Sequence, residues 1–112
     1  MVTASGAPAR FDVVLVRLDP TLGEEMQKTR PCVVVSPDEL NGSLRTLIVA
    51  PMTTAGRDYP WRVPTVFAAT AGRIALDQLR TIDRARVVRR LGALDADASG
   101  RVLDRLAEMF AP

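Results

Sequence analysis

The chain has 112 residues, 47% of them hydrophobic, which suits one folded domain and argues against intrinsic disorder. It has no histidine and a single cysteine, which excludes histidine-dependent triads, two-histidine ribonuclease chemistry and Cys/His metal clusters. The formal net charge is only +2, and Lys28 is the only lysine among 15 basic residues.

Short aliphatic runs, rich in β-branched residues, follow a polar N-terminal stretch. Residues 1–10 lack the apolar segment of a signal peptide and are expected to form a flexible arm before a single domain at 11–112. The runs at 13–16, 32–35 and 46–50 are each followed by turn residues. They are too short for helices and therefore predict buried strands.

The second half of the chain continues this pattern and then changes period. Strands are expected at 61–66, 73–79 and 86–91, at the spacing typical of a sandwich or barrel. Only the tail is predicted to be helical. It begins with an N-cap at 97–99 and has one apolar face, formed by Val102, Leu103, Leu106, Met109 and Phe110. The order predicts a mainly β (β+α) fold, an SH3-like barrel with a C-terminal helix.

Membrane association and thiol chemistry are not expected. No stretch approaches the 18 apolar residues of a membrane span. Cys32 lies among valines and is interpreted as a small buried hydrophobe, since no histidine or second cysteine is present to activate it. A reducing cytoplasm is the expected compartment.

Positive charge is concentrated in one segment. Residues 73–90 contain six arginines and two aspartates, a local net charge of +4, so the remainder of the chain carries −2. A localised basic patch is typical of a protein that binds nucleic acid. A solvated arginine-rich face accounts for the same pattern equally well.

The charged loop at 23–31 is the first candidate site. Arg30 directly precedes Pro31, which biases Arg30 toward extended backbone and so toward a fixed position in the next strand. A fixed arginine is suited to clamp a phosphate or stabilise an oxyanion. The alternative, which local sequence alone favours, is an ion pair that pins the loop, with Glu24, Glu25 or Asp19 as partner.

Two hydroxyls form the second candidate site. Thr53 and Thr54 follow a predicted buried strand, just past Pro51. Such hydroxyls can bond a phosphate oxygen, although more often they bond their own backbone in a turn. Tyr59 and Trp61 follow in the next loop, where aromatic rings can stack on bases, but Trp61 is expected to lie in the core.

The order of these motifs resembles the MazF/PemK family of toxin ribonucleases from type II toxin–antitoxin systems. The pattern G-x-E-x-x-K-x-R-P at 23–31 is followed by P-x-T-T at 51–54 and D-Q-x-R-T-I-D at 77–83. The likeness extends from about residue 12 to residue 91, with a C-terminal helix in the expected place. A chance match to all three motifs in this order is very improbable.

The resemblance implies roles for individual residues. The family's conserved arginine and threonine fall on Arg30 and Thr53, and a loop glutamate implicated in some members falls on Glu25 as a conditional general base. RNA-binding roles are expected for Lys28, Thr54, Arg57, Gln78 and Arg80. No metal and no cofactor are expected.

The resemblance also implies an activity and partners. It implies a sequence-selective, metal-independent endoribonuclease that leaves 2′,3′-cyclic phosphate and 5′-hydroxyl ends on single-stranded RNA. It further implies a homodimer neutralised by a cognate antitoxin, with no role for DNA. Two alternatives stay open: a gyrase-inhibiting toxin on the same fold, which would not need the arginine–threonine pair, and a non-catalytic RNA-binding module.

Overall fold

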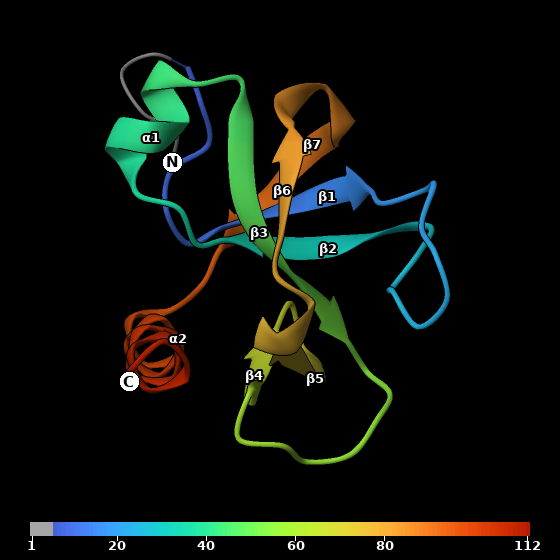
Figure 1. Cartoon of the computed structure of the whole chain (residues 1–112), viewed down its shortest axis with the longest axis vertical. Coiled ribbons are helices and arrows are strands. Elements are labelled where there is room, and N and C mark those ends of the chain that lie inside the picture. The colour runs from blue at the N-terminus through green and yellow to red at the C-terminus, as the bar shows by residue number, and fades with distance from the viewer. Residues whose placement is uncertain (1–5) are drawn as a thin grey trace.

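Seven strands and two α-helices make up the structure, a computed structural model that describes residues 6–112 (Figure 1). In chain order the elements are β1 (Asp12–Arg17), β2 (Thr29–Val34), α1 (Asp38–Ser43), β3 (Thr46–Thr53), β4 (Arg62–Phe67), β5 (Thr70–Ala75), the 3-10 turn η1 (Leu76–Gln78), β6 (Arg80–Asp83), the 3-10 turn η2 (Arg84–Arg86), β7 (Val87–Ala93) and α2 (Ala96–Met109).

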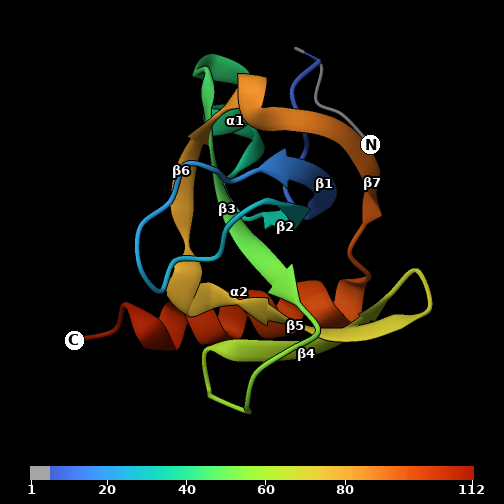
Figure 2. The ribbon, with the colours of Figure 1, turned by 90° about the vertical axis from the view of Figure 1, so that its right-hand side faces the viewer.

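Strand β3 joins the two parts of a curled antiparallel sheet. Its first half pairs with β6, where Leu47 lies opposite Ile82, and its last residues pair with β5, where Met52 lies opposite Ile74. The strand order is β4-β5-β3-β2-β1-β7, with β6 beside β3. Figure 2 shows α2 lying along β4 and β5, with α1 at the far end of the molecule. The predicted class, mainly β with a C-terminal helix, is confirmed.

Two apolar clusters fill the space on either side of the sheet. Alternation along β1 sends Val14 and Val16 into one cluster and Val13 into the other. The first cluster lies inside the curl and is formed by Val14, Val16, Leu18, Cys32, Val34, Leu47, Val49 and Ile82. The second includes Val102 of α2, so burial of this helix face holds α2 against the sheet.

Cys32 is wholly buried in the first of these clusters, as predicted. Burial raises the pKa of its thiol to about 12, and the nearby charges of Arg30 and Arg80 offset this only partly. The thiolate is the reactive form, so the native protein should resist alkylation by iodoacetamide at pH 8. Mass spectrometry should find one modified cysteine only after denaturation. Rapid labelling of the native protein would contradict this burial.

The helices differ from expectation in three ways. The short helix α1 was not predicted, because Asp38–Ser43 is too brief and polar to show an apolar period. Helix α2 starts earlier than expected, since the side chain of Asp95 accepts from Ala98 N as its N-cap. On its predicted apolar face, Leu103 and Phe110 are exposed.

The expected N-terminal arm is tied to the domain over at least part of its length. Ala7 is fully buried, and Asn41 Nδ2 of α1 donates to the carbonyl of Pro8. The backbone N–H of Arg10 donates to Asp38 Oδ1. The packed domain thus includes residues 7–10, which were expected to be flexible, while residues 1–5 of the arm lie outside the described residues. No helix in the described part of the chain is both long and apolar enough to cross a membrane.

Candidate active site

The antiparallel pairing of β2 with β3 brings Arg30 and Thr53 to one groove. Cys32 lies opposite Pro51, and the same register carried two residues further sets Arg30 beside Thr53. Both side chains are half-buried and line an open groove of about 630 Å³. Two residues 23 positions apart in sequence, singled out for separate reasons, therefore share one cavity.

Arg30 makes only neutral contacts in the part of the chain that the structure describes. Its Nη1 lies 3.4 Å from the carbonyl oxygen of Met52 and 3.8 Å from Met26 Sδ. Its Nε lies 3.4 Å from the carbonyl oxygen of Gln27. The alternative of an ion pair that pins the loop is wrong, since no carboxylate among residues 6–112 pairs with Arg30. Its positive charge remains available to an anionic ligand.

The Thr53 hydroxyl is oriented by one accepted hydrogen bond and donates none to residues 6–112. Its Oγ1 accepts a hydrogen bond from Ala55 N at 3.1 Å. This is the turn contact that the sequence offered as the alternative to a phosphate-binding role. Because a hydroxyl both accepts and donates, this contact orients Oγ1 and leaves its hydrogen for a phosphate oxygen. Thr54 is exposed and lines the same groove.

Glu25 and Gln78 lie in a neighbouring pocket of about 320 Å³ rather than beside Arg30. The side chain of Glu25 accepts from Leu22 N at 2.6 Å and so braces its own loop. Gln78 Oε1 accepts from Met26 N at 3.3 Å, which ties this loop to η1. Pro51 lines this pocket, and the next residue of β3, Met52, lines the groove of Arg30. The two pockets are therefore adjacent along that strand.

An ion pair anchors η1, which forms part of the wall of this second pocket. Arg62 Nη2 donates to Asp77 Oδ2 at 2.8 Å, and this hydrogen bond lowers the pKa of the Asp77 carboxyl below its usual value. The Asp77 carboxylate stays ionised through the neutral range and holds the turn that carries Gln78. Arg80 lines the same pocket and donates from Nη1 to the carbonyl of Leu18 at 3.1 Å.

Lys28 and Arg57 do not join either pocket. Lys28 lines another cavity, together with Arg17 and Arg86. The Arg57 guanidinium lies 5.9 Å from the centre of the Tyr59 ring, in the β3–β4 loop. Trp61 packs against the core as expected, whereas Tyr59 is exposed.

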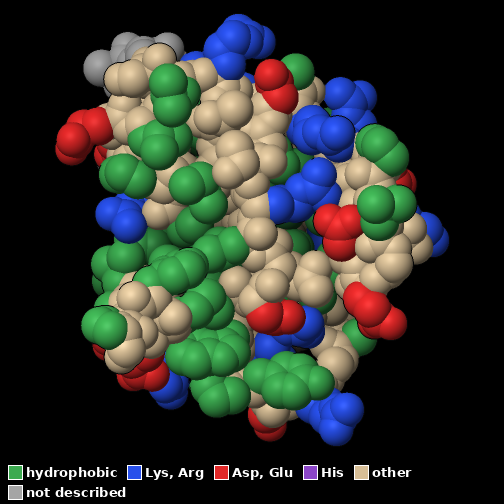
Figure 3. Space-filling view, viewed as in Figure 1, with side chains coloured by type: hydrophobic (Ala, Val, Ile, Leu, Met, Phe, Trp, Pro, Cys, Tyr) green, Lys and Arg blue, Asp and Glu red, His purple; other side chains and the backbone are tan. Residues whose placement is uncertain are grey.

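The apolar wall of the groove was not foreseen from sequence. Phe67, Ala68 and Thr70 come from the β4–β5 hairpin, and Leu91 comes from β7. These residues are remote from the 23–31 and 51–54 motifs in sequence, so only the sheet order brings them to Arg30. In Figure 3 apolar side chains gather around α2 at the lower left and toward the bottom centre, away from the group of basic residues at the upper right.

Comparison with known proteins places this geometry in a family. Residues 9–110 match the family model of the PemK-like, MazF-like toxin of type II toxin–antitoxin systems. Endoribonuclease PemK of Escherichia coli is 36% identical over 107 residues, covering 90% of this chain and 80% of that protein.

Solved structures agree with this match. The crystal structure of MazF (Form-I) from Deinococcus radiodurans has a TM-score of 0.81 and 27% identity, covering 92% of this chain and 96% of that one. A MazE-MazF crystal structure (Form-II) from the same organism has a TM-score of 0.75 and 28% identity, with coverages of 92% and 95%. The chain therefore belongs to the PemK-like, MazF-like toxins of type II toxin–antitoxin systems.

Proposed function

We propose that this protein is an endoribonuclease toxin that cleaves single-stranded RNA without a metal ion. The observation that carries the proposal is that one open groove holds both the oriented hydroxyl of Thr53 and the guanidinium of Arg30, which has no carboxylate partner among residues 6–112. Arg30 and Thr53 supply the charge and the hydrogen-bond donor that a phosphorane requires. The relatives' name, endoribonuclease, supports the same activity.

The chemistry follows from the substrate. The ribose 2′-hydroxyl, which DNA lacks, attacks the adjacent phosphorus while the bond to the 5′-oxygen breaks. The 2′-hydroxyl proton leaves to a base, and the departing 5′-oxygen takes up a proton from solvent water or from the protonated base, giving a 2′,3′-cyclic phosphate and a 5′-hydroxyl. Arg30 stabilises the charge on the phosphorane, and Thr53 donates to a non-bridging oxygen. Glu25 is the candidate base, and it has to release Leu22 N and turn toward the groove when RNA binds.

The surroundings of the pair support binding of unstacked bases. The groove combines apolar Phe67 and Leu91 with the polar Thr54, while Gln78 and Arg80 line the adjoining pocket. Splayed bases need such mixed pockets, since they stack on one surface and bond along their edges. Arg57 and Lys28 lie at the periphery, where they serve backbone phosphates.

The partners are proposed on the same basis. We infer a cytoplasmic homodimer inhibited by an antitoxin, since the similar solved structures include a MazE-MazF pair from Deinococcus radiodurans and a mycobacterial endoribonuclease in complex with its cognate antitoxin. The strands at the two ends of the sheet order, β4 and β7, each expose a large apolar residue, Val66 and Val88. Exposed apolar side chains on strand edges favour contact with a second chain.

The test is incubation of the protein with a long single-stranded RNA in EDTA, with the 5′ ends mapped. Cuts at one recurring short motif, with 5′-hydroxyl ends and no cleavage of the matching DNA, are expected. Cleavage that EDTA abolishes would overturn the metal-free scheme. Intact RNA would favour the alternatives, with binding alone indicating an RNA-binding module and inhibition of gyrase indicating a gyrase toxin.

Replacing Thr53 with valine tests the hydroxyl separately from side-chain shape. Loss of one hydrogen bond to a charged phosphate should lower kcat by about tenfold or more. Thr53→Ser keeps the hydroxyl and should retain most activity. Single-turnover cleavage of a short RNA measures both variants. Equal activity of the valine and serine variants would remove Thr53 from the mechanism.

A further inference from the structure

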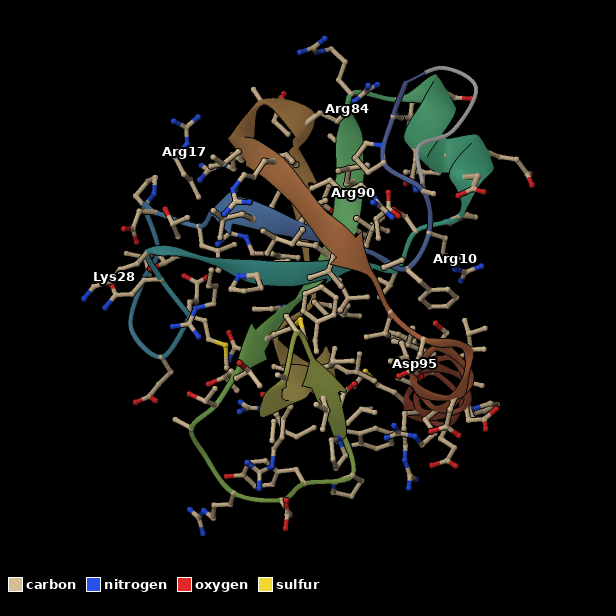
Figure 4. All side chains as sticks on the ribbon, turned by 180° about the vertical axis from the view of Figure 1, so that it is seen from behind. Arg10, Arg17, Lys28, Arg84, Arg90 and Asp95 are labelled. Atoms are coloured by element: carbon tan, nitrogen blue, oxygen red, sulfur yellow. The ribbon has the colours of Figure 1, made fainter. Side chains whose placement is uncertain are left out.

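A basic cavity of about 410 Å³ contains Lys28, and its other residues have no part in the function described so far. It forms where β1 ends, β2 begins and η2 turns back toward them. Its residues are Arg17, Asp19, Lys28, Thr29, Ala85 and Arg86. Figure 4 shows Arg17 and Lys28 on the same side of the molecule, with Arg10 on the opposite side.

The charge of this cavity is not neutralised from within the described chain. Three cations face a single carboxylate, that of Asp19, and none of the three forms an ion pair among residues 6–112. Asp19 Oδ1 instead accepts from the backbone N–H of Lys28 at 2.9 Å. A net charge of about +2 in a recess attracts an anion more strongly than the same charge spread over a convex surface.

Hydrogen bonds to carbonyl oxygens hold the two arginines in place. Arg86 Nη1 donates to the carbonyl of Arg17 at 3.1 Å and to that of Asp19. Arg17 Nη2 donates to the carbonyl of Ala85 at 3.1 Å. Each guanidinium has five N–H donors, so donors remain for a ligand after these contacts are made. The cluster of like charges is therefore built into the fold and not left to mobile side chains.

The cavity and the catalytic groove share one lining residue. Thr29 lines both, and it is the residue before Arg30 in β2. Arg17 is the direct cross-strand partner of Thr29. An RNA strand whose scissile phosphate contacts Arg30 would pass over Thr29 to bring a neighbouring part of its backbone to Arg17 and Lys28.

We propose that this basic cavity binds a backbone phosphate of the RNA that flanks the scissile phosphate. The inference rests on the proposed function, since it assigns a second contact to the same substrate. It places Arg17 and Arg86 in substrate binding beside Lys28. Charge without base-edge contacts would position the strand and leave motif choice to the groove.

The test measures binding separately from cleavage. The probe is a fluorescein-labelled oligonucleotide of random sequence with 2′-O-methyl ribose, which carries phosphates but no nucleophile. Anisotropy titrations over a range of salt concentrations give the slope of log affinity against log salt. Loss of one phosphate contact should reduce the steepness of this slope by about 0.7 for a single strand.

Arg17→Gln and Lys28→Gln are each expected to show this reduced slope and about tenfold weaker binding at 100 mM salt. With cleavable RNA, both variants should mainly raise KM and leave kcat nearly unchanged. Asp19→Asn keeps an acceptor for Lys28 N, removes the only carboxylate and should tighten binding. Arg10→Gln removes one exposed charge from the opposite side and should leave slope and affinity unchanged.

Equal slopes for wild type, Arg17→Gln and Lys28→Gln would overturn the inference, and so would a loss of the same size in Arg10→Gln. This result is distinct from failure of the proposed function, because the anisotropy readout does not depend on cleavage. Circular dichroism and thermal unfolding confirm that each variant is folded. Arg86 is not substituted, since its contacts with β1 and the following loop also support the fold.

Discussion

Arg30→Ala should lower the rate of RNA cleavage on the order of a hundredfold to a thousandfold while leaving the fold intact. The guanidinium lies in the groove with no carboxylate partner in the described part of the chain, so its charge is available to a bound phosphate. Removal of one preorganised donor from a developing oxyanion typically costs this much. Its present contacts, at 3.4 Å to two carbonyl oxygens, contribute little to stability.

Arg30→Lys is the matched control for this change. Lysine keeps the charge but loses the planar fork, so activity should fall between that of wild type and Arg30→Ala. Single-turnover kinetics at saturating RNA report the chemical step, and thermal unfolding reports the fold. An alanine variant that cleaves at near the wild-type rate would show that Arg30 does not stabilise the transition state.

The outline of the fold was predictable from local patterns, but its exceptions depend on tertiary contacts. The aliphatic runs at 13–16, 32–35 and 46–50 became β1, β2 and β3 because each buries a continuous apolar surface. Helix α1 has no comparable pattern. Its buried Asn41 donates to the carbonyl of nearby Ser36 and to that of Pro8, 33 residues away, so part of the support for α1 is remote in sequence.

The turn η1 is a second element that depends on tertiary contacts, and it replaces part of a predicted strand. Residues 73–79 were expected to be one strand, but β5 ends at Ala75 and Leu76–Gln78 form a 3-10 turn. The ion pair of Asp77 with Arg62 and the bond from Met26 N to Gln78 support this turn. Both partners come from other parts of the chain, so the turn could not be predicted from the local propensity of residues 73–79.

The candidate site divides in a similar way. The G-x-E-x-x-K-x-R-P and P-x-T-T motifs identified Arg30 and Thr53, and strand pairing brought them together. The motifs did not reveal that Glu25 braces its loop or that Lys28 lies in a separate basic cavity. A motif gives the order of residues along the chain, whereas their division among cavities depends on how the loop folds over β3.

Gly72→Ala should lower cleavage by about a hundredfold although Gly72 has no chemical role. A Cβ built on this residue would lie 2.8 Å from the carbonyl oxygen of Thr53, closer than real Cβ atoms come. That oxygen belongs to the backbone of β3, so β5 and the end of β3 have to separate. Displacement of a catalytic group by about 1 Å can cost a hundredfold in rate. Overpacking of this kind should also cost about 1–3 kcal/mol of stability.

Gly100→Ala is the matched control, because it makes the same change where space is available. Gly100 is exposed in the middle of α2, and a Cβ there meets nothing within 4 Å. This variant should cleave RNA at the wild-type rate and gain up to about 1 kcal/mol in free energy of unfolding. Activity and chemical denaturation of both variants, measured side by side, separate site geometry from stability. A fully active Gly72→Ala protein would mean that the end of β3 tolerates displacement. Cleavage would then not depend on the position that the structure gives to the hydroxyl of Thr53.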